Sequence, residues 1–143
     1  MDHVGIMKKS WGFLPMILSG EKTIESRWYM NRSVPWGRIS AGDRVYFKDS
    51  GEPVTAVATV SKVLTFENLT PHCIHDILVK YGKKDGIEKD EIPDYVDFLK
   101  DKRYCILVFL GNARAVKPFE INKRGFGAMA AWLTVPHIDA LRR

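Results

Sequence analysis

The stretch GEKTIESRWY, residues 20–29, contains both a structural signal and a chemical one. Gly20 follows an apolar segment, at the position where glycine typically ends a helix. Residues 23–29 are largely β-branched and aromatic, with roughly alternating polarity, which predicts a strand. Because side chains alternate across a strand, Glu25 and Arg27 should share one face, and the residues next to them should occupy the other.

Three charged side chains of this stretch could form a polar ligand site. Lys22 lies at the turn, and its long stem can reach the face of Glu25. An arginine offers a planar fork for a phosphate or a base edge, and a lysine offers a point charge. A glutamate can accept a hydrogen bond from an exocyclic amine or transfer a proton. The alternative is an exposed strand whose surface ion pair is worth about 0–1 kcal/mol.

Short strands and short helices surround this stretch. Helices are expected at residues 11–19, 70–81 and 94–100, with Ser10 and Thr70 as N-caps. Strands are expected at residues 3–7, 23–29, 44–48, 54–64, 104–110, 113–121 and 130–135. Turns are expected at 49–53 and 111–112, a solvated charged loop at 83–91, and a terminal helical turn at 137–142. This is an α+β pattern, and its tight hairpins favour a mostly antiparallel, small and nearly closed β-barrel with two or three short flanking helices.

Length and composition are typical of one globular domain spanning residues 1–143, with 45% hydrophobic and 27% charged residues. No run of about 18 apolar residues predicts a membrane span, and the N-terminus does not resemble a signal peptide. Cys73 and Cys105 stand far apart and are expected to be reduced thiols. A cytoplasmic location is therefore expected.

Residues 20–27 resemble the G-x-K-x-x-E-x-R signature of the ASCH domain family, a branch of the PUA-like superfamily. The context agrees, because a short helix precedes the motif and the turn Gly42-Asp43 later opens an apolar strand. The resemblance covers the chain from Val4 to about Val135. It implies a small β-barrel with flanking helices and a pocket lined by the motif residues. It also implies a role in RNA binding, RNA metabolism or coactivation, and some members of the family are enzymes.

One enzymatic branch that this chain resembles removes the acetyl group from N4-acetylcytidine with a lysine, a threonine and a glutamate. Lys22 matches the lysine, Glu25 occupies the position of the threonine, and Asp76 and Ile77 stand where the glutamate is expected. Another member is a ribonuclease. In an enzyme of this fold, Lys22 would be the catalytic amine or a charge stabiliser, and Glu25 the proton-transfer group. A protein-interaction module is a third interpretation.

Aromatic and basic residues outside the motif extend the predicted ligand site. Aromatic side chains beside cations suit base stacking, whereas Trp28 and Phe47 are expected in the barrel core. The basic loop at residues 122–126 could follow a phosphate backbone or be a solvated connector. The predicted ligand-binding residues are Ser10, Trp11, Lys22, Glu25, Arg27, Trp36, Tyr46, Lys48, Lys123 and Arg124.

The formal net charge of +5 favours RNA or a nucleotide-like small molecule as the partner, although a charge of this size also merely keeps a small domain soluble. No P-loop or dinucleotide-binding fingerprint is present. His72, Cys73, His75 and Asp76 cluster on one predicted helix, but no second cluster completes a four-ligand site. We therefore expect no metal and no cofactor.

Overall fold

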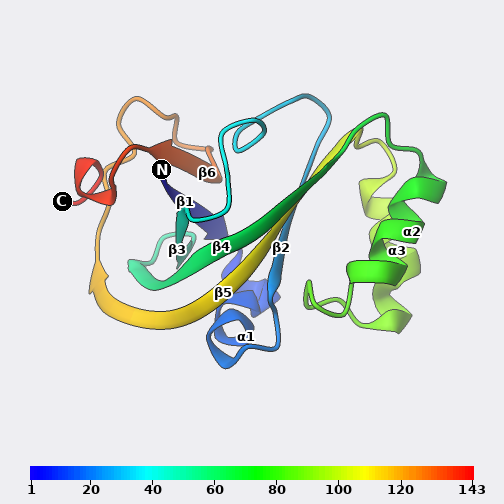
Figure 1. Cartoon of the computed structure of the whole chain (residues 1–143), viewed down its shortest axis with the longest axis horizontal. Coiled ribbons are helices and arrows are strands. Elements are labelled where there is room, and N and C mark those ends of the chain that lie inside the picture. The colour runs from blue at the N-terminus through cyan, green and yellow to red at the C-terminus, as the bar shows by residue number, and fades with distance from the viewer.

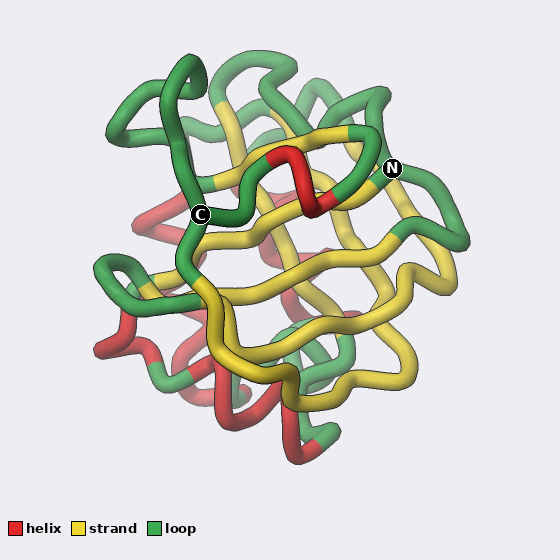
Figure 2. Tube along the Cα trace, turned by 90° about the vertical axis from the view of Figure 1, so that its left-hand side faces the viewer, coloured by secondary structure: helices red, strands yellow, loops and turns green.

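In the computed structural model, which describes residues 1–143, the alternating segments form one strongly curved six-stranded sheet (Figures 1 and 2). The strands are β1 (Asp2–Met7), β2 (Ile24–Tyr29), β3 (Arg44–Asp49), β4 (Val54–Phe66), β5 (Tyr104–Phe119) and β6 (Trp132–Val135). The helices are α1 (Phe13–Ser19), α2 (Pro71–Tyr81) and α3 (Ile92–Leu99). Short 3-10 turns cover Lys9–Trp11, Lys89–Glu91 and Ile138–Ala140.

The order of the strands in the sheet is β2-β5-β4-β3-β1-β6. Only β1 and β3 pair in parallel, and every other neighbouring pair is antiparallel. The strands β2 and β6 are thus the two edges of a half-barrel. The predicted α+β class, with a mostly antiparallel barrel-like sheet and three short helices, is confirmed. None of the helices combines the length and the apolar character needed to cross a bilayer.

Both faces of the sheet are buried, because successive side chains point to opposite sides. On β3, Val45 and Phe47 pack inside the curve, while Tyr46 packs on the outer face under the C-terminal segment. On β5, Ile106 points inside the curve and Leu107 points towards the helices. The expected core position of Phe47 is confirmed.

The helices α2 and α3 lie side by side beyond the β2 end of the sheet (Figure 1). The Thr70 hydroxyl accepts the Cys73 backbone N–H, and Pro71 occupies the first turn, as the sequence predicted. The apolar side of α2 packs against the outer face of β2 and β5. This packing holds α3 beside the edge strand that carries the motif.

Two local predictions were wrong. Residues 113–121 are not a separate strand, because β5 runs through residues 111–112 and both of its halves pair with the long strand β4. Asn112, with a φ of 51°, lies where the register shifts, so it belongs to an irregularity of the ladder rather than to a hairpin turn. Ser10 does not cap α1, because it lies in a 3-10 turn and Gly12, with a φ of 70°, precedes the helix.

Candidate functional site

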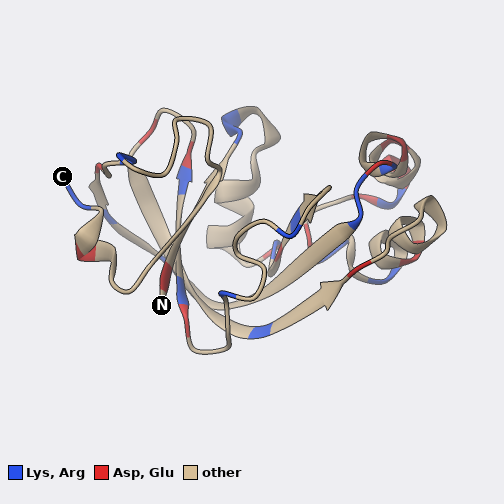
Figure 3. Cartoon of the chain, turned by 90° about the horizontal axis from the view of Figure 1, so that it is seen from above, with Lys and Arg blue, Asp and Glu red and all other residues tan.

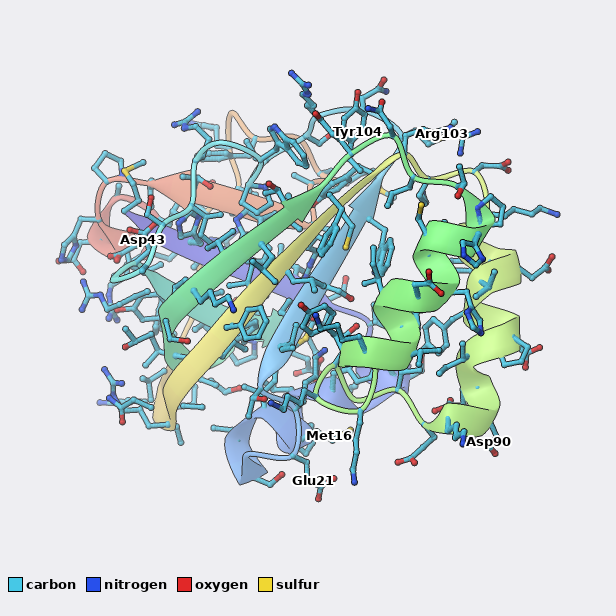
Figure 4. All side chains as sticks on the ribbon, turned by 45° about the vertical axis from the view of Figure 1, so that its right-hand side comes forward. Met16, Glu21, Asp43, Asp90, Arg103 and Tyr104 are labelled. Atoms are coloured by element: carbon cyan, nitrogen blue, oxygen red, sulfur yellow. The ribbon has the colours of Figure 1, made fainter.

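The turn between α1 and β2 points Lys22 into the protein. Gly20 has a φ of 86°, which glycine adopts without steric strain, and the Lys22 backbone N–H donates to Met16 O at 3.0 Å. Figure 4 shows Met16 and Glu21 at this end of β2. As a result the Lys22 side chain is only 1% exposed.

The Lys22 ammonium has a full set of acceptors. Its Nζ donates to Ile24 O at 2.7 Å and to Asp85 O and Oδ1 at 2.6 Å each, and lies 3.2 Å from Glu25 Oε1. Burial alone would lower the pKa of Lys22, but the charges of Asp85 and Glu25 raise it above its ordinary value. Lys22 is therefore a charged structural cation, and it lacks the free amine that a nucleophile needs.

Glu25 and Arg27 share one face of β2, as predicted, and they form an ion pair. Arg27 Nη2 lies 2.7 Å from Glu25 Oε2, and the Arg27 side chain is 12% exposed. Burial would raise the pKa of Glu25, but the charges of Lys22 and Arg27 hold it below its ordinary value. Arg27 is thus largely buried and paired with an acid.

Arg27 also connects the two edges of the half-barrel. Its Nη1 donates to Ala131 O at 3.2 Å, and its Nη2 donates to Ile6 O at 3.3 Å. Its guanidinium carbon lies 5.0 Å from the centre of the Trp132 ring. Because Arg27 projects from β2, whereas Ala131 directly precedes β6, one side chain spans the gap that no strand pairing closes.

Asp85 is the member of the site that sequence reasoning missed. Residues 83–91 were expected to be a solvated loop, but Asp85 is 3% exposed and Ile87 is 4% exposed. The Ser26 hydroxyl donates to Asp85 Oδ2. Burial and the nearby Glu25 charge raise the pKa of Asp85, although Lys22 opposes this shift.

The loop that carries Asp85 is tied to β2 by its backbone. Lys84 O accepts the N–H groups of Thr23 at 2.8 Å and Ile24 at 3.0 Å. Gly86 turns the chain with a φ of 84°. The dipeptide Asp85-Gly86 before an apolar Ile87 was the one available sequence signal for a tight turn with a buried side.

The four charged side chains compensate one another. Lys22 and Arg27 supply two positive charges, and Glu25 and Asp85 supply two negative charges. No buried side-chain nitrogen or oxygen in the chain lacks a hydrogen-bond partner. We call these four residues the ionic cluster. It is formally neutral and saturated, so it offers no unpaired charge to a ligand.

A cavity of about 530 Å³ opens above the ionic cluster, between β2, α3 and the segment around Trp11. Six of its 17 lining residues are aromatic, and Lys8, Lys102 and Asp94 add charged groups outside the ionic cluster. The aromatic lining residues are Trp11, Phe13, Trp28, Tyr29, Tyr95 and Phe98. Trp11 and Phe98 are 53% and 74% exposed and so can contact a ligand from solvent. Trp28, expected in the core, packs on the α2 side and also lines the cavity.

The cavity brings together only part of the predicted ligand site. Trp11, Lys22, Glu25 and Arg27 line it, whereas Ser10, Trp36, Tyr46, Lys48, Lys123 and Arg124 do not. Trp36 packs edge-on against Tyr104, with 5.3 Å between ring centres. Tyr46 is 6% exposed, because the outer face of β3 is a second core rather than a rim.

The basic residues of the predicted site lie elsewhere. Lys123 Nζ donates to Ala128 O and Ala130 O at 2.8 Å each, so it braces its own loop. Arg124 is exposed on that loop, and Lys48 is buried on the outer face of β3. Basic and acidic positions are interspersed along the strands and helices (Figure 3).

No protein-family model and no curated protein sequence matches the chain. Solved structures do match it. The ASCH protein of Zymomonas mobilis has a TM-score of 0.66 at 16% identity, over 97% of this chain and 90% of that one. A point mutant of the same protein has a TM-score of 0.64 at 17% identity, over 94% and 87%. The protein EF3133 of Enterococcus faecalis, assigned to family DUF984, has a TM-score of 0.50 at 12% identity, over 80% and 76%.

Proposed function

Since the chain has the fold of an ASCH domain, we propose that it binds RNA or a nucleotide-like ligand and that the cavity beside β2 receives one base. The observation that carries this proposal is the combination of aromatic lining residues with the ionic cluster at the base of the cavity, which is formally neutral and has all its donors paired. A cavity of about 530 Å³ is of the size that accommodates small molecules.

The ionic cluster at the base of the cavity favours an uncharged ring over a phosphate. Every strong donor of Lys22 is engaged within the ionic cluster, so a buried anion would find no free positive charge there. Stacking on aromatic side chains contributes roughly 1–3 kcal/mol per base and suits any planar base. The cations Lys8 and Lys102 lie in the lining and can face the phosphate of the same nucleotide.

A titration tests this proposal. Uridine should quench the tryptophan fluorescence with little dependence on salt, because Trp11 and Trp28 line the cavity. Labelled single-stranded RNA should bind with an affinity that falls as salt increases. Phe98→Ala should weaken the binding of uridine and of RNA by about 5- to 150-fold, from the lost stacking of roughly 1–3 kcal/mol. Phe126→Ala, an exposed phenylalanine outside the cavity, is the matched control. No RNA binding at low salt, or binding without a salt dependence, contradicts the proposal.

Asp85 favours a second candidate, an enzyme of the same fold that acts on a modified nucleoside or on RNA. Burial raises the pKa of Asp85, and a carboxyl group that lines a cavity with its pKa raised is suited to proton transfer. In such an enzyme Asp85 would transfer the proton, and Lys22 would stabilise charge rather than attack as an amine. Incubation with N4-acetylcytidine and with RNA tests this candidate. It is rejected if neither is turned over faster than by Asp85→Asn and Lys22→Ala.

A further inference from the structure

One edge of β2 is not paired with another strand. β2 is the last strand of the sheet, and its only partner is β5. Leu110 N donates to Thr23 O at 2.8 Å, and this bond fixes which residues of β2 turn their backbone groups towards β5. In an antiparallel pair such residues alternate along the strand. The odd-numbered residues of β2 therefore bond to β5, and the even-numbered ones point their N–H and C=O groups the other way.

The even-numbered residues differ in whether these groups find a partner within the chain. Ile24 has two, because its N–H donates to Lys84 O at 3.0 Å and its C=O accepts from Lys22 Nζ at 2.7 Å. Ser26 and Trp28 bond to each other through their side chains, with Trp28 Nε1 donating to Ser26 Oγ at 3.0 Å. No group of the chain bonds to their backbone N–H or C=O groups.

These free backbone groups open into the cavity of about 530 Å³. Five consecutive residues of β2, 25–29, belong to its lining. Because side chains alternate between the two faces of a strand, a cavity lined by five residues in a row meets the strand along its edge. Trp28 packs on the α2 side of the sheet, whereas Tyr29 packs against the core inside the curve. A flat group bonded to this edge therefore has an aromatic side chain on each side of its plane.

The free edge is too short to take up another strand. At one end Lys84 occupies the N–H of Ile24, and at the other end β2 stops at Tyr29. Between these points only Ser26 and Trp28 offer free groups, whereas a bound strand uses a row of several residues. A nucleobase is shorter, and its Watson–Crick edge carries donors and acceptors side by side. The length of the edge thus favours a base over a peptide.

We propose that the backbone of Ser26 and Trp28 reads the Watson–Crick edge of the base in the cavity, with one N–H donating to the base and one C=O accepting from it. This inference rests on the proposed function and states how that site recognises its ligand. Neutral backbone groups fit an uncharged base, in agreement with an ionic cluster that has no donor to spare. A base paired in a duplex already uses this edge, so the contact selects unpaired bases.

Methylated uridines test the hydrogen bonds to the strand edge. In 3-methyluridine the methyl group blocks the Watson–Crick edge, and in 5-methyluridine the same group lies away from it. Titrated into the intact protein and followed by tryptophan fluorescence, 3-methyluridine should bind about 5- to 150-fold more weakly than uridine, the range expected from two lost hydrogen bonds. 5-Methyluridine should bind like uridine. Equal affinities for uridine and 3-methyluridine, or equal losses with both methyl groups, would overturn the edge contact.

Hydrogen exchange, followed residue by residue by NMR, identifies the backbone groups. In the free protein the amides of Ser26 and Trp28 should exchange fast, because they have no acceptor. The amides of Glu25 and Arg27 bond to β5 and are the matched controls on the same strand, with slow exchange. Saturating uridine should slow at least one of the two edge amides, and 3-methyluridine should slow neither. Edge amides as slow as the controls in the free protein would reveal a partner within the chain and overturn the proposal.

The outcomes separate this inference from the proposed function. If 3-methyluridine binds as well as uridine and neither edge amide slows, the base occupies the cavity without using the edge, and only this inference fails. If neither uridine nor labelled single-stranded RNA binds, the proposed function fails, and the edge has no base to read. Selective loss of 3-methyluridine binding together with a slowed edge amide supports both.

Discussion

Replacing Arg27 with alanine removes one partner from a buried ion pair and two donors from the gap between the sheet edges. Losing one partner of a buried pair typically costs about 3–5 kcal/mol. Glu25 keeps Lys22 at 3.2 Å as a second partner, and the two carbonyl contacts of Arg27 are long, at 3.2 and 3.3 Å. We therefore expect Arg27→Ala to lose about 3 kcal/mol of unfolding free energy, at the lower end of that range.

Urea unfolding followed by tryptophan fluorescence measures this loss, because urea is uncharged and does not screen ion pairs. Arg27→Lys keeps a charge beside Glu25, but one ammonium cannot replace the planar fork, so we expect a loss of about 1–2 kcal/mol. Arg32 provides the matched control, because its pair with Glu67 is equally short, at 2.8 Å, but 59% and 48% exposed. Arg32→Ala should lose less than about 1 kcal/mol. Equal losses in Arg27→Ala and Arg32→Ala would refute the reasoning.

Three further predictions concern the same site. The pKa of Glu25 is lowered from 4.5, so the stabilisation by its charge is present above pH 4.5 and is lost as the pH falls through the lowered pKa. In Glu25→Gln, the free energy of unfolding, measured by urea titration at a series of acidic pH values, should therefore fall less steeply as the pH is lowered. Asp85→Asn leaves the buried Lys22 ammonium with one carboxylate fewer, so it should lower the free energy of unfolding by about 3 kcal/mol. It should also speed hydrogen exchange at the Thr23 amide, and unchanged exchange would contradict the role of the loop in holding β2. Gly86→Ala should lose about 1–2 kcal/mol in urea unfolding, more than Gly51→Ala, which has a similar positive φ but open space around it.

Local sequence patterns were enough to predict the face shared by Glu25 and Arg27. A period of two residues determines this relation wherever the backbone is extended, whatever the partner strand is. The same period separates Phe47 from Tyr46, but it does not say what covers the second face. Because the C-terminal segment covers that face, Tyr46 became a core residue instead of a rim residue.

Long-range contacts were beyond local reasoning. Asp85 meets Lys22 across 63 positions, from a charged stretch whose composition is typical of solvated loops. The pair Gly111-Asn112 has the residues of a hairpin turn, and the same conformational freedom also suits an irregularity in a continuous strand. The length of β4 decides between these two structures, because it offers both halves of β5 a partner.

The position of β1 has a consequence for the order of folding. β1 lies between β3 and β6, and its contact with β6 joins residues about as far apart as His3 and Thr134, which are separated by 131 positions. Closing a loop of that length is entropically unfavourable, and contacts at such separations slow folding. The pairing of β1 with β3 spans only about a third of that separation, so we expect it to form first. Until β6 arrives, β1 is an unprotected edge that can pair with another chain, and the rate at which β6 docks then sets how long the folding protein is exposed to aggregation.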